Sequence, residues 1–474
     1  MIGKRDGGHR WTDRSRQISP TATAENAERR TSVGMFMYPG GQSHGFDICE
    51  VAMELVNRGV NVFVSVINYD IKPFQRYIEK NSRNVEVAFY DGDYEAASRP
   101  DEDAKLWIVR YDPAATDDVR EFEVSWLREK HENDSNFTQY TSEITYEDML
   151  RDHKVTRVQM AMQHKDLAVQ GKLLFGYTIK YCFDLMNSAI SNSAFSSVDM
   201  MIIDPASNCA SLSAVRFKKP FGIAVFGSLH PYISATSTIQ PWVPTMNSGY
   251  LPSSMSVWDA TANIIHGLKM KYVVLPKMSI GWCDLVEKMG IDTEFSISLT
   301  STQCDRVIAY REQMSLVRVF FTELEAPREI YPSELFVGSL TTKPAKPLPL
   351  DDDGVAEFVN NADNGFIFIS LGTQAAFEMK RTLMIRDAVE SLNMRVVWKI
   401  TGQSTAKEKE MLTRSGRVKL VDWVSQNDIL GHPNIRAFFS HVGRHSLEEA
   451  AFHGVPLLIM PLFADQSEVW FPFL

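Results

Sequence analysis

The stretch of sequence that decides the fold lies near the end of the chain, where residues 423–466 read WVSQNDILGHPNIRAFFSHVGRHSLEEAAFHGVPLLIMPLFADQ. The apolar and aromatic run 436–440 predicts a short buried parallel strand, and the run 446–453 has helical composition and stops at Gly454. A second strand is predicted at 455–460. Such a βαβ unit directs backbone N–H groups and the positive end of a helix toward a ligand. The stretch therefore predicts an anion site, most suitably for a phosphate group.

Side chains around the predicted turn make this ligand more specific. The indole of Trp423 offers a flat face on which a base can stack, and Gln426 offers a paired donor and acceptor for an amide-like edge. His441 and Ser446 flank the turn and can bind a phosphate group. These residues predict that a base and a phosphate bind at the same site.

Three further residues extend the predicted site toward sugar groups. Glu449 can accept hydrogen bonds from ribose hydroxyls, and Asp465 with Gln466 can bind several sugar hydroxyls at once. A nucleotide that carries a sugar would satisfy all of these positions.

Structural roles also fit several of these residues. Ser446 and Glu449 have the spacing of a capping box, which closes the start of a helix and is compatible with ligand binding. Trp423 alone also fits a packed core aromatic, and His441 alone fits a turn histidine with satisfied hydrogen bonds. Their coincidence at fixed spacings favours the ligand site.

The pattern resembles the signature of the UDP-glycosyltransferases, and most closely that of animal, nematode-like UDP-glucuronosyltransferases. The resemblance implies an α/β fold of two Rossmann-like domains that face each other across a cleft, the GT-B architecture. It also implies that the second domain binds a UDP-sugar. The positions that match in order and spacing are Trp423, Gln426, His441, Gly443, Ser446, Glu449, Gly454, Pro456, Asp465 and Gln466.

Two positions depart from the family signature. Val442 stands where the family has the second glycine of its His-Gly-Gly triplet, and a β-branched residue resists unusual φ and ψ. His445 stands where the family has asparagine, although it can still donate a hydrogen bond or carry positive charge toward phosphate. These departures predict weaker donor binding or a rebuilt turn.

Other residues join the predicted donor site through the resemblance. A Ser-Leu-Gly turn after a strand lies against the donor pyrophosphate in the family, which assigns Ser370 and Gly372 to this site. Lys399 stands where the family usually has arginine, so the positive charge is retained and the bidentate fork is lost.

Two motifs in the first half carry the predicted catalysis. His44 follows the predicted strand 33–38 in a glycine-rich turn before a helix at about 46–57, and Asp204 ends the apolar part of the run 198–209. By the resemblance, His44 is the catalytic base and Asp204 holds its imidazole. Each also fits a structural role, as a turn histidine and as a turn-initiating aspartate before proline. The turn lacks the GxGxxG spacing of a dinucleotide site.

The resemblance implies an inverting transfer of a sugar, glucuronate, from a UDP-sugar to a hydroxyl or similar nucleophile of a small lipophilic acceptor. His44 would remove the acceptor proton, and Asp204 would orient the imidazole and stabilise its charged form. His441, the region of Gly443, and Ser446 would stabilise the charge on the departing UDP. A UDP-glucosyltransferase of the same fold remains an alternative, as does a catalytically weak or inactive UDP-sugar-binding homologue.

Composition bounds the domain organisation. A chain of 474 residues with 44% apolar and 23% charged residues is globular and too long for one ordinary core. We predict a disordered lead-in at 1–31, an acceptor-binding Rossmann-like domain at 32–340, a proline-rich linker at 341–353 and a UDP-sugar-binding Rossmann-like domain at 354–474.

Charge and cysteine usage argue against other classes of protein. The formal net charge of −10 argues against a general nucleic-acid binder. The five cysteines are odd in number and lack CxxC spacing, so neither a disulfide framework nor a metal site is predicted. No cofactor is expected, since the UDP-sugar is a co-substrate.

Targeting signals that the family has are not visible in this sequence. The first thirty residues lack an apolar segment, and no run of about 18 apolar residues follows. The family normally carries a cleaved signal and a membrane anchor, so we expect a chain truncated at both ends, with its second domain incomplete. The resemblance implies a detoxification enzyme on the lumenal side of the endoplasmic reticulum membrane. A homo-oligomeric state is left open.

Overall fold

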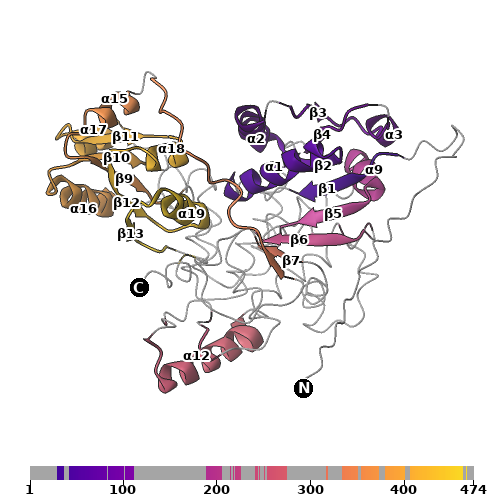
Figure 1. Ribbon diagram of the computed structural model, residues 1–474. Helices are drawn as coiled ribbons and strands as arrows, with labels where there is room; N and C mark the ends of the chain where they lie inside the picture. The colour runs from indigo at the N-terminus through magenta and orange to yellow at the C-terminus, as the bar shows by residue number, and fades with distance from the viewer. Residues whose placement is uncertain are drawn as a thin grey trace, which may run out of the picture.

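The computed structural model describes residues 29–36, 42–82, 84–100, 102–111, 188–204, 214, 217, 219–225, 241–243, 245, 250, 254–274, 316–318, 334–350, 354–372, 379–400, 406–462 and 466. The predictions for residues 1–28, 37–41, 205–209, 351–353 and 463–465 lie outside this part, and they include the assignment of Asp465. The described chain forms two α/β units, each built on its own parallel sheet and joined by an extended connector (Figure 1).

The sheet of the first unit has its parallel strands in the order β3-β4-β2-β1-β5-β6-β7-β8. Their bounds are β1 Ser32–Phe36, β2 Asn61–Ile67, β3 Val87–Phe89, β4 Leu106–Tyr111, β5 Met200–Ile203, β6 Phe221–Val225, β7 Leu316–Arg318 and β8 Glu334–Phe336. The strand order reverses beside β1, which pairs with β2 on one side and with β5 on the other. Open α/β sheets bind ligands at the carboxyl ends of the strands at such a reversal.

Helices cover both faces of this first sheet. They are α1 Gln42–Asn57, α2 Asn68–Asn81, α3 Tyr94–Ala97 and α9 Ala189–Ser197, whereas α12 Val257–Lys269, which continues into a π-helical turn at Met270–Val274, lies apart from the sheet in Figure 1. Ile48, Ala52 and Val56 recur every four residues along α1 and belong to the core beneath it. Phe195 of α9 packs on Phe36 with ring centroids 4.4 Å apart. Successive residues of β1 therefore face different helices.

The starts and ends of several elements differ from the sequence predictions. Helix α1 begins at Gln42, so His44 lies in its first turn and not in a preceding glycine-rich turn. The first amide groups of a helix need no intrahelical partner, which lets polar residues and glycine occupy that turn. Strand β5 is shorter than the run 198–209, since it spans only Met200–Ile203.

The sheet of the second unit has its parallel strands in the order β11-β10-β9-β12-β13. Its strands are β9 Phe366–Ser370, β10 Arg395–Lys399, β11 Val418–Val421, β12 Ile435–Ser440 and β13 Leu457–Ile459. Its helices are α15 Val355–Asn360, α16 Met379–Glu390, α17 Ala406–Thr413, α18 Gln426–Leu430 and α19 Arg444–His453. All residues of β9 are buried, as expected for a central parallel strand. Here the order reverses between β9 and β12.

Residues 337–350 leave β8 and run in extended form toward the second unit, as the orange trace in Figure 1 shows. Among the helices of the described ranges, none is both long and apolar enough to cross a membrane.

Candidate functional site

The reversal of strand order in the second sheet brings the predicted donor residues together. Ser370, Lys399 and Ser440 end neighbouring strands, with Ser370 in register with each of the other two. The turns that follow β9 and β12 carry Gly372 and His441. The carboxyl edge of this sheet is therefore lined by the residues that the sequence assigned to the donor.

Two glycines allow the His441 ring to occupy this edge. A Cβ atom at Gly372 would lie 2.7 Å from Nε2 of His441, and one at Gly443 would lie 2.6 Å from the same atom. Real Cβ atoms essentially never make contacts this short, so any larger residue at either position would displace the ring. Gly372 also has a φ of +85°, which glycine adopts without strain.

Burial lowers the pKa of both basic residues at this edge. Burial lowers the pKa of His441 to about 4, against the opposing effect of a backbone hydrogen bond at Ser370, and Lys399 lowers it further. Burial likewise lowers the pKa of Lys399, whereas nearby Glu449 raises it. His441 is consequently neutral at physiological pH and can offer a hydrogen bond but no charge.

The turn after β12 takes an unusual conformation at the position where the sequence departs from the family. Val442 has a φ of +56°, in the left-handed region that β-branched residues avoid. Its side chain is fully buried, and its N–H donates to Oγ of Ser440 at 3.0 Å. The backbone therefore keeps the conformation that glycine would favour, despite the valine.

The capping-box interpretation of Ser446 and Glu449 is wrong. Helix α19 begins at Arg444 with Gly443 as its N-cap, so Ser446 lies inside the first turn. Nε2 of Gln426 instead donates to Oγ of Ser446 at 3.0 Å and to Oε2 of Glu449 at 2.6 Å. A tertiary contact between α18 and α19 thus holds both side chains.

The trio of Gln426, Ser446 and Glu449, together with the nearby Trp423, has two properties that suit nucleotide recognition. Burial raises the pKa of Glu449 to about 7, although the hydrogen bond from Gln426 lowers it, so the carboxyl group changes charge near neutral pH. Trp423 lies three residues before Gln426 and is 62% exposed, which contradicts its interpretation as a core aromatic. An exposed indole near a partly buried polar trio provides both a stacking surface and hydrogen-bonding groups.

The remaining assigned residues lie at two other places. His44 in α1 follows β1, and Asp204 follows β5, the neighbour of β1 in the sheet; Asp204 is only 2% exposed. Both residues thus follow the carboxyl ends of adjacent strands. Gln466 is buried, and its Oε1 accepts from the N–H of Leu462 at 2.8 Å, which ties together the loop after β13.

Sequence reasoning missed a group of ionisable residues beside the donor turn. Nε2 of His445 lies 2.8 Å from Oδ2 of Asp47 in α1, and Arg444 pairs with both Asp47 and Glu448. The opposite charges of Arg444 and Glu448 four residues apart predict an ion pair within a helix. No pattern in the sequence points from them to Asp47.

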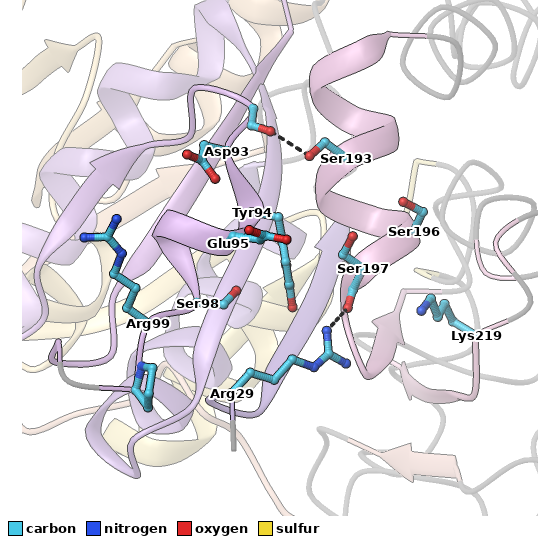
Figure 2. A pocket seen from close by; sticks show the side chains of 12 residues that line it. Arg29, Asp93, Tyr94, Glu95, Ser98, Arg99, Ser193, Ser196, Ser197 and Lys219 are labelled. Atoms are coloured by element: carbon cyan, nitrogen blue, oxygen red, sulfur yellow. Dashed lines mark hydrogen bonds between the residues drawn. The ribbon is translucent and has the colours of Figure 1, made fainter. Parts of the chain in front are cut away.

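A separate hollow lies in the first unit, near the amino ends of the strands of its sheet. Figure 2 shows Arg29, Tyr94, Ser197 and Lys219 among its lining residues, with Arg29 donating to the carbonyl of Ser197 at 2.8 Å. Arg29 and Lys219 precede β1 and β6, so the hollow borders the amino ends of the strands. Parallel sheets bind ligands at the carboxyl ends, which separates this hollow from the candidate donor site.

The arrangement of two α/β units, each with a parallel sheet whose strand order reverses, is that of the GT-B class of glycosyltransferase fold. Solved structures support this class. The structure of Os79 from O. sativa in complex with UDP aligns with a TM-score of 0.50 at 13% identity, over 93% of this chain and 84% of that chain. The glycotransferase of kitacinnamycin aligns with a TM-score of 0.52 at 12% identity, over 94% and 83% of the two chains.

Sequence comparison identifies the family. Residues 104–469 match the family described as "UDP-glucoronosyl and UDP-glucosyl transferase", and this chain belongs to that family. UDP-glucuronosyltransferase 2C1 of Oryctolagus cuniculus is 30% identical over 276 residues, which cover 57% of this chain and 51% of that protein. UDP-glucuronosyltransferase 2A2 of Homo sapiens is 27% identical over 335 residues, which cover 67% and 57%. The chain thus spans about half the length of these relatives.

Proposed function

We propose that this chain transfers a sugar, with inversion at the anomeric carbon, from a UDP-sugar to a small lipophilic acceptor. Glucuronate is the proposed sugar, and a hydroxyl or similar nucleophile is the proposed acceptor group. The observation that carries the proposal is the hydrogen-bonded trio of Gln426, Ser446 and Glu449 beside the exposed Trp423. Family membership and the names of the relatives support the same reaction.

The donor would bind along the carboxyl edge of the second sheet. Trp423 would stack on the base, Gln426 would bind its amide-like edge, and Glu449 would accept from the ribose hydroxyls. The turn at His441 and Gly443 would surround the pyrophosphate, where neutral hydrogen-bond donors and the start of α19 stabilise the charge that develops on UDP. Solved relatives of the same fold contain UDP, which supports UDP as the nucleotide.

Catalysis would come from the first unit. A hydroxyl is a poor nucleophile at neutral pH, so it needs a base within hydrogen-bonding reach. His44 would take the acceptor proton as the acceptor oxygen forms a bond to the anomeric carbon and the bond from that carbon to UDP breaks. Asp204 would orient the imidazole and stabilise its protonated form. The order of strands supports this pairing, because both residues follow neighbouring strands.

Two other candidates each rest on an observation. A UDP-glucosyltransferase of the same fold is favoured by the family description, which covers both sugars. A homologue that binds UDP-sugar with little or no turnover is favoured by the left-handed Val442 and by the contact of His445 with Asp47. By the same family resemblance, we also propose membrane association at the lumenal side of the endoplasmic reticulum.

The proposal is tested by incubating the purified protein with UDP-glucuronate or UDP-glucose and a panel of small phenols and alcohols. We expect mass spectrometry to detect a glucuronide, and NMR to show an inverted anomeric centre. A glucoside alone would identify the glucosyltransferase, and UDP binding without transfer would identify the binding homologue. A protein that neither binds UDP nor transfers a sugar would contradict the proposal.

UDP affinity is expected to fall about tenfold between pH 8 and pH 6. Because the pKa of Glu449 is about 7, the carboxylate form predominates at pH 8 and the neutral acid at pH 6. The carboxylate is the stronger acceptor for ribose hydroxyls. Calorimetric titrations at pH 6, 7 and 8 measure this dependence.

The variant Glu449→Gln is the control for that measurement, since the phosphate of UDP itself also titrates, with a pKa of about 6. The variant should retain only the part of the pH dependence that comes from UDP. Equal pH dependence in both proteins would remove Glu449 from the ribose site.

A further inference from the structure

Residues of both units form one buried ionisable cluster beside the candidate site. Arg444 of α19 contacts Asp47 of α1, a residue almost 400 positions earlier, and the other nitrogen of its guanidinium lies 3.2 Å from Oε1 of Glu448. His445 lies 2.8 Å from the same carboxylate of Asp47. Asp47 and Glu448 are inaccessible to solvent, and the side chain of Arg444 is 6% exposed. We call these four residues the interdomain cluster.

The burial of the cluster restricts how the two units can approach each other. Charged groups removed from water are stable only when a partner of opposite charge lies at hydrogen-bonding distance. If α1 moved away from α19, the ion pair between Asp47 and Arg444 would break while both side chains were still partly buried. The cluster therefore disfavours relative positions of the two helices that would separate Asp47 from Arg444.

The location of the cluster connects the two halves of the proposed site. Asp47 lies three residues after His44 on α1, which is less than one helical turn. Arg444 lies two residues before Ser446 and five before Glu449 on α19. A helix moves as a nearly rigid element, so the position of Asp47 relative to Arg444 sets the position of the base relative to the donor.

Two more exposed ion pairs also join α1 and α2 to the connector and the second unit. Lys343 of the connector lies 2.6 Å from Oε1 of Glu50 in α1, and Lys80 of α2 lies 3.6 Å from Oδ2 of Asp428 in α18. The side chain of Lys80 is 49% exposed, and exposed ion pairs contribute little. Lys80 therefore offers a matched control, an interdomain ion pair outside the buried cluster.

We propose that Asp47 and Arg444 are positioning residues for sugar transfer, which hold the helix that carries His44 against the helix that carries Ser446 and Glu449. This inference rests on the proposed function. It adds that the two residues act through alignment and contact neither donor nor acceptor. Loss of the pair should therefore lower turnover more than donor affinity.

The first test compares Asp47→Asn, Arg444→Gln, the double variant and Lys80→Gln. We expect each cluster variant to lower kcat by roughly ten- to a hundredfold, the effect of a small misplacement of reacting groups. UDP affinity by calorimetry should change less than about threefold, and Lys80→Gln should match the wild type. The double variant should lose less than the product of the two single losses, because the contact between Asp47 and Arg444 can be lost only once. It also remains useful if a single variant fails to fold.

The second test is independent of turnover. Hydrogen–deuterium exchange is measured for the backbone of α1 with and without UDP, in the wild type, in Arg444→Gln and in the double variant. We expect UDP bound to the second unit to slow exchange in α1 of the wild type, and this response to be lost in both variants although UDP still binds. The matched Lys80→Gln protein should keep the response.

The outcomes separate the two proposals. An inactive wild type whose α1 still responds to UDP only through Arg444 would overturn the transferase proposal, and with it a role in sugar transfer, but it would support the alignment of α1 and α19 by the cluster. An active wild type whose cluster variants keep kcat within twofold, or lose kcat and UDP affinity equally, would overturn the positioning role alone. An α1 response that is absent in the wild type or retained in the variants would also overturn it.

Discussion

Replacement of His44 by alanine is expected to reduce sugar transfer by at least about a hundredfold, the usual effect of removing a general base. UDP affinity should remain nearly unchanged. His44 belongs to the first unit, in the first turn of α1, whereas the candidate donor residues with described positions lie in the second unit. Steady-state kinetics with saturating donor and acceptor, together with calorimetry of UDP, measure the two effects separately.

A matched imidazole far from the proposed reaction provides the control. Nε2 of His432 is hydrogen-bonded to Oδ1 of Asn360 at 3.0 Å, near the amino ends of the strands of the second sheet. His432→Ala should keep kcat within about twofold of the wild type. If His44→Ala retained comparable activity, the base would have to be another residue, and the proposed mechanism would be wrong.

Replacement of Trp423 by alanine is expected to weaken UDP binding by about tenfold or more. Stacking of a base on an aromatic side chain contributes about 1–3 kcal/mol, and each 1.4 kcal/mol corresponds to a factor of ten. The indole is 62% exposed and makes little core contact, so its removal should leave the fold intact. Calorimetry at pH 8 measures the affinity of each protein.

Two further variants define what the Trp423 result means. Trp423→Phe retains an aromatic face and should recover most of the affinity, whereas Trp258→Ala removes an indole that is 82% exposed on α12 and should have no effect. Unchanged UDP affinity in Trp423→Ala would exclude stacking at this position.

The regular parts of the fold were predictable from local patterns. The βαβ unit around residue 440 could be recognised because a short apolar run, a tight turn and a helix ended by glycine follow one another, and Gly454 indeed takes the left-handed conformation at the end of α19. The two-domain α/β class followed from the same kind of signal together with the family signature. Such signals depend only on residues close in the sequence.

Helix starts and side-chain partners were less predictable. Ser446 and Glu449 satisfy the spacing of a capping box, but Gln426, twenty positions from Ser446, binds both side chains in the folded protein. Local spacing shows only that a capping hydrogen bond could form within the helix. The packing of α18 on α19 shows that Gln426 is the partner of both side chains.

The interdomain cluster could not be predicted at all. Asp47 and Arg444 are separated by 397 positions, and their contact depends on how two separately folded units meet. Asp47 lies on an amphipathic helix, where acidic residues are usual, so nothing in the sequence marks it as a contact to the second unit. His445 accordingly looked like a phosphate ligand, whereas its Nε2 contacts a carboxylate of the first unit.

The left-handed Val442 has a consequence for the thermodynamics of donor recognition. A glycine in this turn would exchange between positive and negative φ in the unliganded protein and would lose that freedom when phosphate bound. Val442 is instead held by a fully buried side chain and a hydrogen bond to Ser440, so its strain, about 1–2 kcal/mol, is already present before the ligand arrives. The turn is thereby preorganised, and if UDP binds here as proposed, its binding would lose less conformational entropy than it would with the glycine typical of the family.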